Sequence, residues 1–197
     1  DLEEALVKDE PFYTKNHFSY QINAPFQKVN HHLLKWETSF LLNEDHKFDF
    51  THAVQWDLRK EFDVRRAGRS LKPAMSLDQT SNFTELKYNG YLSNNWEISS
   101  GFQSNLINNL NVTGTGILPL IPDYTSNKLG LFILATKKKQ QFNFEFGGRY
   151  DFLDQRVATI TRGIAKEIKR YHNKVSNIGL AGGAKYIFSN DLHLSYN

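Results

Sequence analysis

The sequence predicts an all-β fold, an antiparallel up-and-down transmembrane β-barrel, from three observations. Long segments alternate between apolar and polar residues. Short turns and long loops join these segments in regular succession. Trp and Tyr residues fall on the apolar positions, several near segment ends: Trp36, Trp56, Tyr88, Trp96, Tyr150 and Tyr186. Outer-membrane barrels combine tight turns at one end, longer loops at the other, and aromatic girdles at both bilayer interfaces.

The segment Gln141–Asp154 shows the alternation most clearly. Its even positions from 142 to 152 are apolar or small, and its odd positions carry mainly amides and charges. Because successive side chains of a strand point to opposite faces, one face would be aromatic and the other polar. The run exceeds the roughly 5–6 residues of a typical strand and suits the about 9–11 residues of a tilted membrane strand. One long strand of a soluble sandwich or lipocalin-like barrel would show the same pattern. The choice between a membrane barrel and a soluble β fold therefore depends on the rest of the chain.

Four hairpins are expected along the chain. In the first, Asn30–Leu42 and His46–Phe62 alternate around the short polar turn Asn43–Asp45. The later strands are joined in the same way by tight turns. They are Thr80–Leu92 with Trp96–Ser104, Lys128–Thr136 with Gln141–Asp154, and Val175–Phe188 with Leu192–Asn197. Two alternating runs separated by a short polar turn are typical of a β-hairpin.

Three long segments without a period separate the hairpins: Asp63–Gln79, Asn105–Asn127 and Leu153–Lys174. All three would lie at the same end of the sheet. Within the last one, Ile160–His172 is a candidate for a short helix over the barrel mouth. The final strand, Leu192–Asn197, is too short to span a bilayer, so we expect part of a larger barrel.

The composition excludes several classes of function. No apolar run reaches the roughly 18 residues of a membrane helix, so any spanning structure must be β. The chain has 0 Cys, which removes thiolate metal sites and Cys nucleophiles, and its net charge of +3 is small for a nucleic-acid-binding protein. We find no catalytic motif, and we expect no enzyme activity, cofactor or metal site. The adjacent His31 and His32 would point to opposite faces of a strand, which disfavours a shared metal ion.

A basic cluster is the best candidate for ligand binding. Its members are Arg59, Lys60, Arg65, Arg66, Arg69 and Lys72. Guanidinium groups pair bidentately with carboxylate and phosphate, so an anionic ligand such as a ferric chelate is one expectation. Contact with lipopolysaccharide phosphates is an equal alternative. The candidate ligand-binding residues are Arg59, Arg65, Arg66 and Arg69 in this region, together with Arg149 on the polar wall of the barrel.

Several short phrases of the sequence, in their order and spacing, resemble one family. They are Gly101–Gln103, Asn108–Asn111, Ile121–Tyr124, Gly130–Phe132, Glu145–Asp151 and Ser176–Tyr186. Together they resemble the barrel region of TonB-dependent outer-membrane receptors, especially those of the Bacteroidetes type. The resemblance implies that residues 1–197 supply the middle strands of a barrel of about 22 strands around a plug domain. Neither a plug domain nor a TonB box is recognisable here.

The resemblance also implies a function and a location. A receptor of this family sits in the bacterial outer membrane, contacts its lipid and lipopolysaccharide, and takes up a scarce nutrient, foremost a ferric siderophore or similar metal chelate. TonB would energise it through the missing plug region. Receptors for haem, cobalamin, peptides and glycans share the same barrel pattern. The alternatives are a small structural or adhesive outer-membrane barrel without transport activity and, third, a soluble lipid-binding β-barrel.

Overall fold

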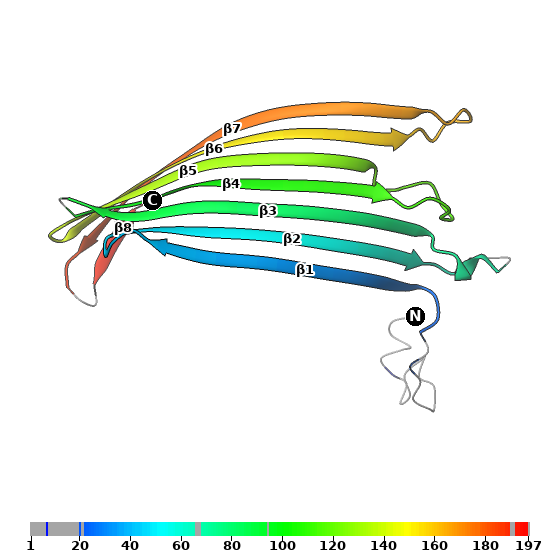
Figure 1. Cartoon of the computed structure of the whole chain (residues 1–197), viewed down its shortest axis with the longest axis horizontal. Coiled ribbons are helices and arrows are strands. Elements are labelled where there is room, and N and C mark those ends of the chain that lie inside the picture. Colours follow the sequence, from blue (N-terminus) through cyan, green and yellow to red (C-terminus); the bar gives the residue numbers. More distant parts are fainter. Residues whose placement is uncertain are drawn as a thin grey trace.

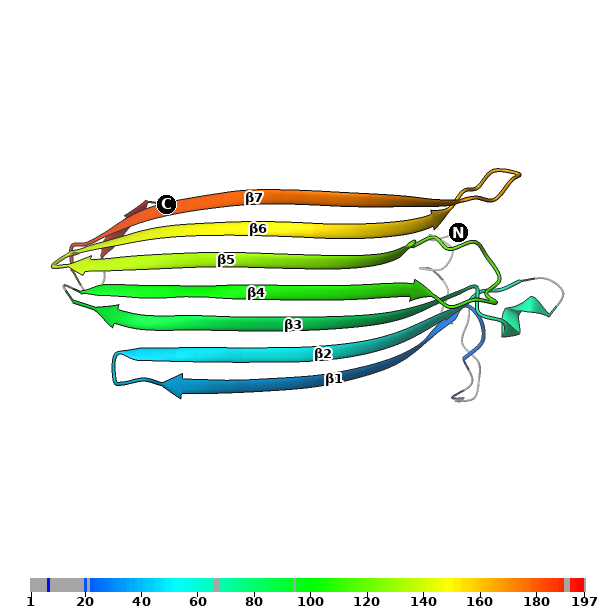
Figure 2. The ribbon, with the colours of Figure 1, turned by 45° about the horizontal axis from the view of Figure 1, so that its top comes forward.

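The chain forms one antiparallel sheet in a computed structural model, which describes residues 7, 20, 22–65, 68–93, 95–189 and 192–196. The sheet has 8 strands in sequence order, as Figures 1 and 2 show. They are β1 (Phe26–Leu41), β2 (His46–Phe62), β3 (Met75–Leu92), β4 (Trp96–Asn111), β5 (Asp123–Lys139), β6 (Phe142–Ile160), β7 (Ile168–Ile187) and β8 (His193–Tyr196). A single 3-10 turn, η1 (Arg69–Leu71), lies between β2 and β3. The predicted all-β, up-and-down, antiparallel arrangement is confirmed.

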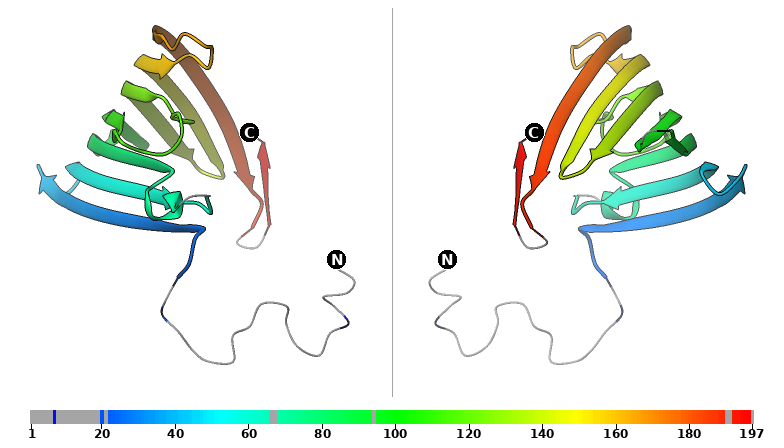
Figure 3. Two further views of the ribbon diagram at one scale, coloured as in Figure 1. Left: turned by 90° about the vertical axis from the view of Figure 1, so that its right-hand side faces the viewer. Right: turned by 90° about the vertical axis from the view of Figure 1, so that its left-hand side faces the viewer.

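The sheet is curved and open. End-on views show β1 and β8 apart at its two edges (Figure 3). Among the described residues, each of these two strands pairs with one neighbour only. None of the described residues belongs to a helix that is long and apolar enough to cross a membrane.

Short turns and long loops occupy opposite ends of the sheet (Figure 1). The short connections are 42–45, 93–95, 140–141 and 188–192, and the long ones are 63–74, 112–122 and 161–167. In the short turns, Asn95 and Gln140 have φ of 60° and 52°, the left-handed conformation that sharp reversals require. The predicted alternation of connection lengths is therefore confirmed.

The strands extend further toward the long loops than the sequence pattern predicts. β6 ends at Ile160 rather than Asp154, and β7 begins at Ile168 rather than Val175. The prediction of a short helix in Ile160–His172 is wrong, because residues 168–172 belong to β7 and a loop fills 161–167. Backbone pairing continues where the apolar alternation stops, since exposed charged side chains do not interrupt a hydrogen-bonded ladder.

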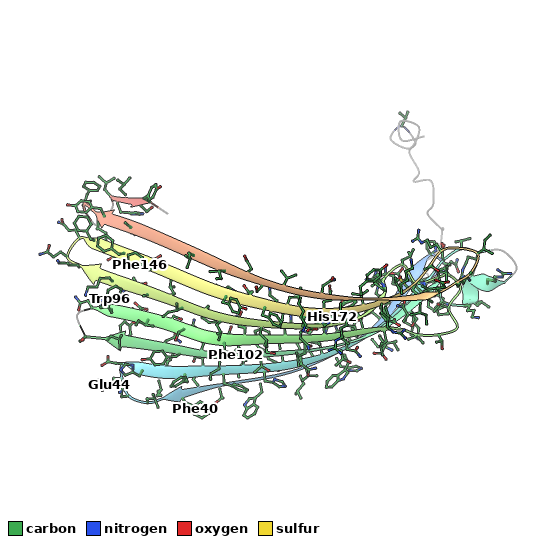
Figure 4. The ribbon with its side chains drawn as sticks, turned by 90° about the horizontal axis from the view of Figure 1, so that it is seen from above. Phe40, Glu44, Trp96, Phe102, Phe146 and His172 are labelled. Carbon is green, nitrogen blue, oxygen red and sulfur yellow. The ribbon has the colours of Figure 1, made fainter. Side chains whose placement is uncertain are left out.

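The register divides the side chains into two chemically different faces. Phe50 lies opposite Leu86 on β3. The same row of cross-strand partners, which we call a level, continues through Phe102, Leu131, Tyr150 and Ile178 on the following strands. We call this side of the sheet the aromatic face, and Figure 4 labels Phe40, Phe102 and Phe146 on it. The opposite side is the polar face, which carries Asp49, Glu85, Gln103, Arg149 and Asp151.

The aromatic face is the more exposed of the two. On β5, Leu131 and Ile133 are 56% and 51% exposed, whereas Gly130 on the polar face is buried. Trp56 and Phe146 are 46% and 54% exposed, so these side chains are not packed in a closed core. Exposed apolar surface on this scale is unusual for a soluble protein and marks a contact with something apolar.

The apolar part of the aromatic face, which we call the apolar belt, runs obliquely across the strands. On β2 it continues toward the long loops as far as Leu58. The level of Trp56 passes through Thr80, Asn108 and Thr125 and reaches Arg156 and His172, which are already polar. On β6 the belt instead runs from Phe142, beside the short turn, to Phe152. On β6 the belt therefore lies nearer the short turns than it does on β2. Between them, the belt on β3 ends at Leu86, and β4 carries Leu110 level with Leu58.

Candidate functional site

A hydrogen-bonded group on the polar face joins β3, β4 and β6. The guanidinium of Arg149 donates from Nε to Asp151 Oδ2 and from Nη2 to Asp151 Oδ1, both at 2.8 Å. Nη2 also donates to Gln103 Oε1 at 2.9 Å, and the amide of Gln103 donates to Glu85 Oε2. We call Glu85, Gln103, Arg149 and Asp151 the Arg149 network.

The Arg149 network crosses β5 because two residues lack side chains. Gly130 on β5 lies level with Gln103 on one side and Asp151 on the other. A Cβ at Gly130 would lie 2.5 Å from Arg149 Nη2, so only glycine leaves room for the guanidinium to reach Gln103. Gly101 makes space in the same way for the ring of Phe132, which lies 6.0 Å from Arg149 Cζ.

A second polar group extends this surface to β1 and β2. Asp49 accepts a hydrogen bond from Ser39 Oγ at 2.6 Å and one from Asn89 Nδ2 at 2.9 Å. Lys47 Nζ lies 3.0 Å from the same carboxylate. Paired charges and amides therefore occur on the polar face from β1 to β6, level with much of the apolar belt behind them, with Phe132 and Leu134 of β5 among them.

The charged groups of this arrangement are paired with one another and remain in contact with water. The carboxylate of Asp151 faces a guanidinium, and that guanidinium is fixed by two partners. The Arg149 and Asp151 side chains are 38% and 23% exposed, so water reaches them. Asp57 pairs with His31 on the polar face at 3.3 Å, while His32 lies on the aromatic face. Within the described ranges, no three His, Asp or Glu side chains gather closely enough to hold a metal ion.

The structure separates the predicted basic cluster. Arg59 lies on the polar face and pairs with Glu61 at 2.6 Å, whereas Lys60 lies on the aromatic face. Arg69 and Lys72 are exposed in the 63–74 loop. Arg66 lies outside the described residues. Among the described candidates for ligand binding, Arg69 is therefore exposed, whereas Arg59, Arg65 and Arg149 are half-buried.

Arg65 has a structural role that the sequence did not reveal. Its Nη2 donates to the carbonyl of Lys72 at 2.7 Å, and its backbone N–H donates to Ser70 Oγ at 2.8 Å. Its guanidinium occupies the space that a side chain at Gly116 would need. Arg65 thus packs the 63–74 loop against the 112–122 loop.

Asp123 shapes the 112–122 loop. Its Oδ1 accepts hydrogen bonds from the backbone N–H of Asn111 at 2.7 Å and from Asn111 Nδ2 at 2.8 Å. Asn109, which is buried, donates to the carbonyl of Pro122 at 3.3 Å. These bonds close the base of the loop.

Sequence reasoning missed the contributions of Glu85, Gln103 and Gly130. Each was visible as a polar or small residue, but only the register shows that they meet. It also missed a charged group on the aromatic face, where Asp154 lies 3.0 Å from His172 Nε2. Lys174 and Arg156 flank the same carboxylate at 3.7 and 3.9 Å.

The substitution Gly130→Ala tests the Arg149 network. The new Cβ should displace the guanidinium from Gln103 and lower the free energy of unfolding by about 1 kcal/mol or more. Gly179→Ala is the matched control, because Gly179 lies level with Arg149 and a Cβ there meets nothing within 4 Å. Urea-induced unfolding of the purified variants measures both effects. Equal losses for the two variants would show that Arg149 does not depend on the gap at Gly130.

No protein-family model matches the chain, and no curated protein matches it.

Proposed function

We propose that this chain forms part of the wall of an outer-membrane β-barrel receptor of the TonB-dependent type. In this proposal the receptor takes up a scarce nutrient, foremost a ferric siderophore or similar metal chelate. The observation that carries the proposal is the oblique apolar belt on one face of the sheet, opposite a paired polar network on the other.

The oblique course of the apolar belt supports a membrane barrel. Strands of a closed barrel tilt by about 35–45° from its axis, so a horizontal hydrocarbon layer crosses neighbouring strands at shifted positions. The shift of the belt from Leu58 on β2 to Phe152 on β6 has this form. The core of a soluble sandwich would have to be covered by a second sheet, and the described residues form one layer only.

Strand length supports the same placement. β1 to β7 contain between 16 and 20 residues each, well beyond the about 9–11 that cross a bilayer. The strand residues beyond this length lie on the side of the long loops. There, β6 and β7 carry Arg156 and His172 on the aromatic face. In the proposed barrel these ends stand clear of the hydrocarbon and hold the long loops outside the cell.

The polar face supports a water-filled interior. Charged side chains on a lipid-facing surface are costly at the bilayer midplane, whereas lumen-facing charges are tolerated. Within the middle of the belt, the charged residues Asp49, Glu85, Arg149 and Asp151 lie on the polar face. On the aromatic face, charged residues lie toward the strand ends, such as Lys137 and Lys139 beside the short turn of β5 and Arg156 toward the long loops. An interior lined in this way passes polar solutes.

Two features favour a large receptor over a small structural or adhesive barrel. Eight strands are enough to close the smallest membrane barrels, yet β1 and β8 lie apart (Figure 3). In addition, three phrases behind the resemblance supply three of the four members of the Arg149 network and both of its glycine gaps. Gly101–Gln103 contributes Gly101 and Gln103, Gly130–Phe132 contributes Gly130 and Phe132, and Glu145–Asp151 contributes Arg149 and Asp151.

The membrane placement predicts a depth-dependent effect of charge on one face of one strand. Leu131→Arg puts a cation at the middle of the belt and should destabilise the folded protein in bilayers by about 2–4 kcal/mol. Thr125→Arg places the same cation on the same face of β5, beyond the belt, and should cost about 0–1 kcal/mol. Denaturant unfolding in lipid vesicles measures the difference. Similar costs at both positions would contradict a hydrocarbon layer at Leu131.

The transport proposal predicts loss of uptake when the gene is deleted. Cells lacking the gene should take up a labelled ferric chelate poorly, and the restored gene should recover uptake. If uptake of every chelate tested is unchanged by deletion, the iron-receptor proposal fails and the structural or adhesive barrel is favoured.

The exposed cations of the 63–74 loop predict a charge effect on the captured chelate. Changing Arg69 and Lys72 together to Glu should weaken binding of an anionic chelate by roughly tenfold or more, because charged contacts are lost and reversed. Lys139→Glu at the opposite end of the sheet should leave binding unchanged. Titration of cells with labelled chelate measures the affinity. Equal affinity in all three proteins would assign the ligand site elsewhere.

A further inference from the structure

We propose that the aromatic face of β6 and β7 holds the phosphate group of an outer-leaflet lipid at the loop-side border of the apolar belt. This inference rests on the proposed membrane placement. The residues that carry it are Arg156, Arg170 and Lys174, which we call the border cations, together with the neighbouring His172.

The border cations lie directly beyond the last apolar residues of the belt. On β6, Phe152 is followed on the same face by Asp154 and Arg156. On β7, Ile178 is followed in the same direction by Ser176, Lys174, His172 and Arg170. Figure 4 shows His172 well along the sheet from Phe146, toward the long loops. Cations at this height meet anionic headgroups, which attract each nearby Lys or Arg.

One carboxylate does not neutralise the border cations. Asp154 accepts from His172 Nε2 at 3.0 Å, and the charged ends of Lys174 and Arg156 lie 3.7 and 3.9 Å away. Asp154 is 19% exposed, whereas Arg156 and Lys174 are 73% and 60% exposed. The cluster therefore presents positive charge outward, with its single carboxylate underneath.

A hollow beside the border cations has room for a phosphate. It is an open hollow of about 400 Å³ across β4 to β7, and its lining combines apolar residues such as Leu110, Val157 and Ala158 with Arg156, Arg170, His172, Asn108 and Thr125. The two arginines supply positive charge, and Asn108 and Thr125 supply neutral hydrogen-bond donors. Asp123 is the acid that also lines it, and its Oδ1 already accepts two hydrogen bonds from Asn111.

A second hollow, in the apolar belt of the same strands, suits an acyl chain. Gly148 leaves a space of about 410 Å³ between Leu131, Ile133, Tyr150 and Ile178. Gly148 and Arg156 lie on the same face of β6, roughly 26 Å apart at about 3.3 Å per residue. With the strand tilt this becomes about 20 Å of depth, close to one leaflet with its headgroup. The two hollows together match a phosphate-bearing lipid rather than free phosphate.

Lipid binding by the reconstituted protein tests this proposal. We expect the protein in phosphatidylcholine vesicles to bind a fluorescent diphosphoryl lipid A. The triple variant Arg156→Gln, Arg170→Gln, Lys174→Gln should bind it roughly tenfold or more weakly. The matched control, Lys128→Gln, Lys169→Gln, Lys185→Gln, removes three charges from the polar face of β5 and β7 and should bind like the unchanged protein. Dephosphorylated lipid A should bind weakly to every variant.

The outcomes separate this inference from the proposed function. Flotation of the protein with vesicles reports membrane insertion independently of lipid binding. If the protein inserts but both triple variants bind lipid A equally, the border cations are not a lipid site, although the barrel stands. If inorganic phosphate displaces lipid A as effectively as a second phosphorylated lipid does, the border cations bind phosphate alone. The space beside Gly148 then does not contribute to binding. Failure to float with vesicles would overturn the membrane placement itself.

Discussion

Cross-strand pairing from β1 to β7 is the constraint on which the rest of the structure depends. Because the sheet is a single layer, the register alone decides which side chains share a face. A shift of one residue on any strand would carry its aromatic side chains to the polar face and its charges to the aromatic face. The Arg149 network ties this register across β3, β4 and β6, since Gln103, Gly130 and Asp151 must lie level for Arg149 to reach across β5.

The two ends of the sheet have different chemistry. Near the short turns, aromatic side chains pack on one another. The ring centroids of Phe142 and Tyr186 lie 4.7 Å apart in a tilted pair, and those of Tyr186 and Phe188 lie 4.6 Å apart edge to face. Near the long loops, charged side chains and loop contacts such as that of Arg65 prevail. In the proposed barrel, this division would separate the part of the strands that meets hydrocarbon from the part that meets water. Strand length, the belt and the loops then agree with one proposed orientation in a bilayer.

Much of the fold could be predicted from the sequence, and the limits have physical causes. The ends of β1 and β2 beside their short turn were predicted closely, because the polar turn Asn43–Asp45 interrupts a strong apolar alternation. β5 instead continues to Lys139, three residues beyond the predicted end at Thr136. The loop-side ends were not predicted closely, because β6 and β7 lose that alternation after Phe152 and before Ile178 while their backbones remain paired. Of the candidate site, Arg149 was identified as part of a polar wall. Its partners Gln103 and Glu85 were not, because they lie on other strands and only the register brings them together.

The most direct test of this account measures which face of β5 meets hydrocarbon. The chain contains 0 Cys, so single cysteines can carry a spin label at each position from Leu129 to Ala135 in the bilayer-reconstituted protein. The account predicts that odd positions are accessible to dissolved oxygen and even positions to a water-soluble nickel complex, in strict alternation. Alternation in the opposite sense, or equal accessibility of both faces to the nickel complex, would contradict it.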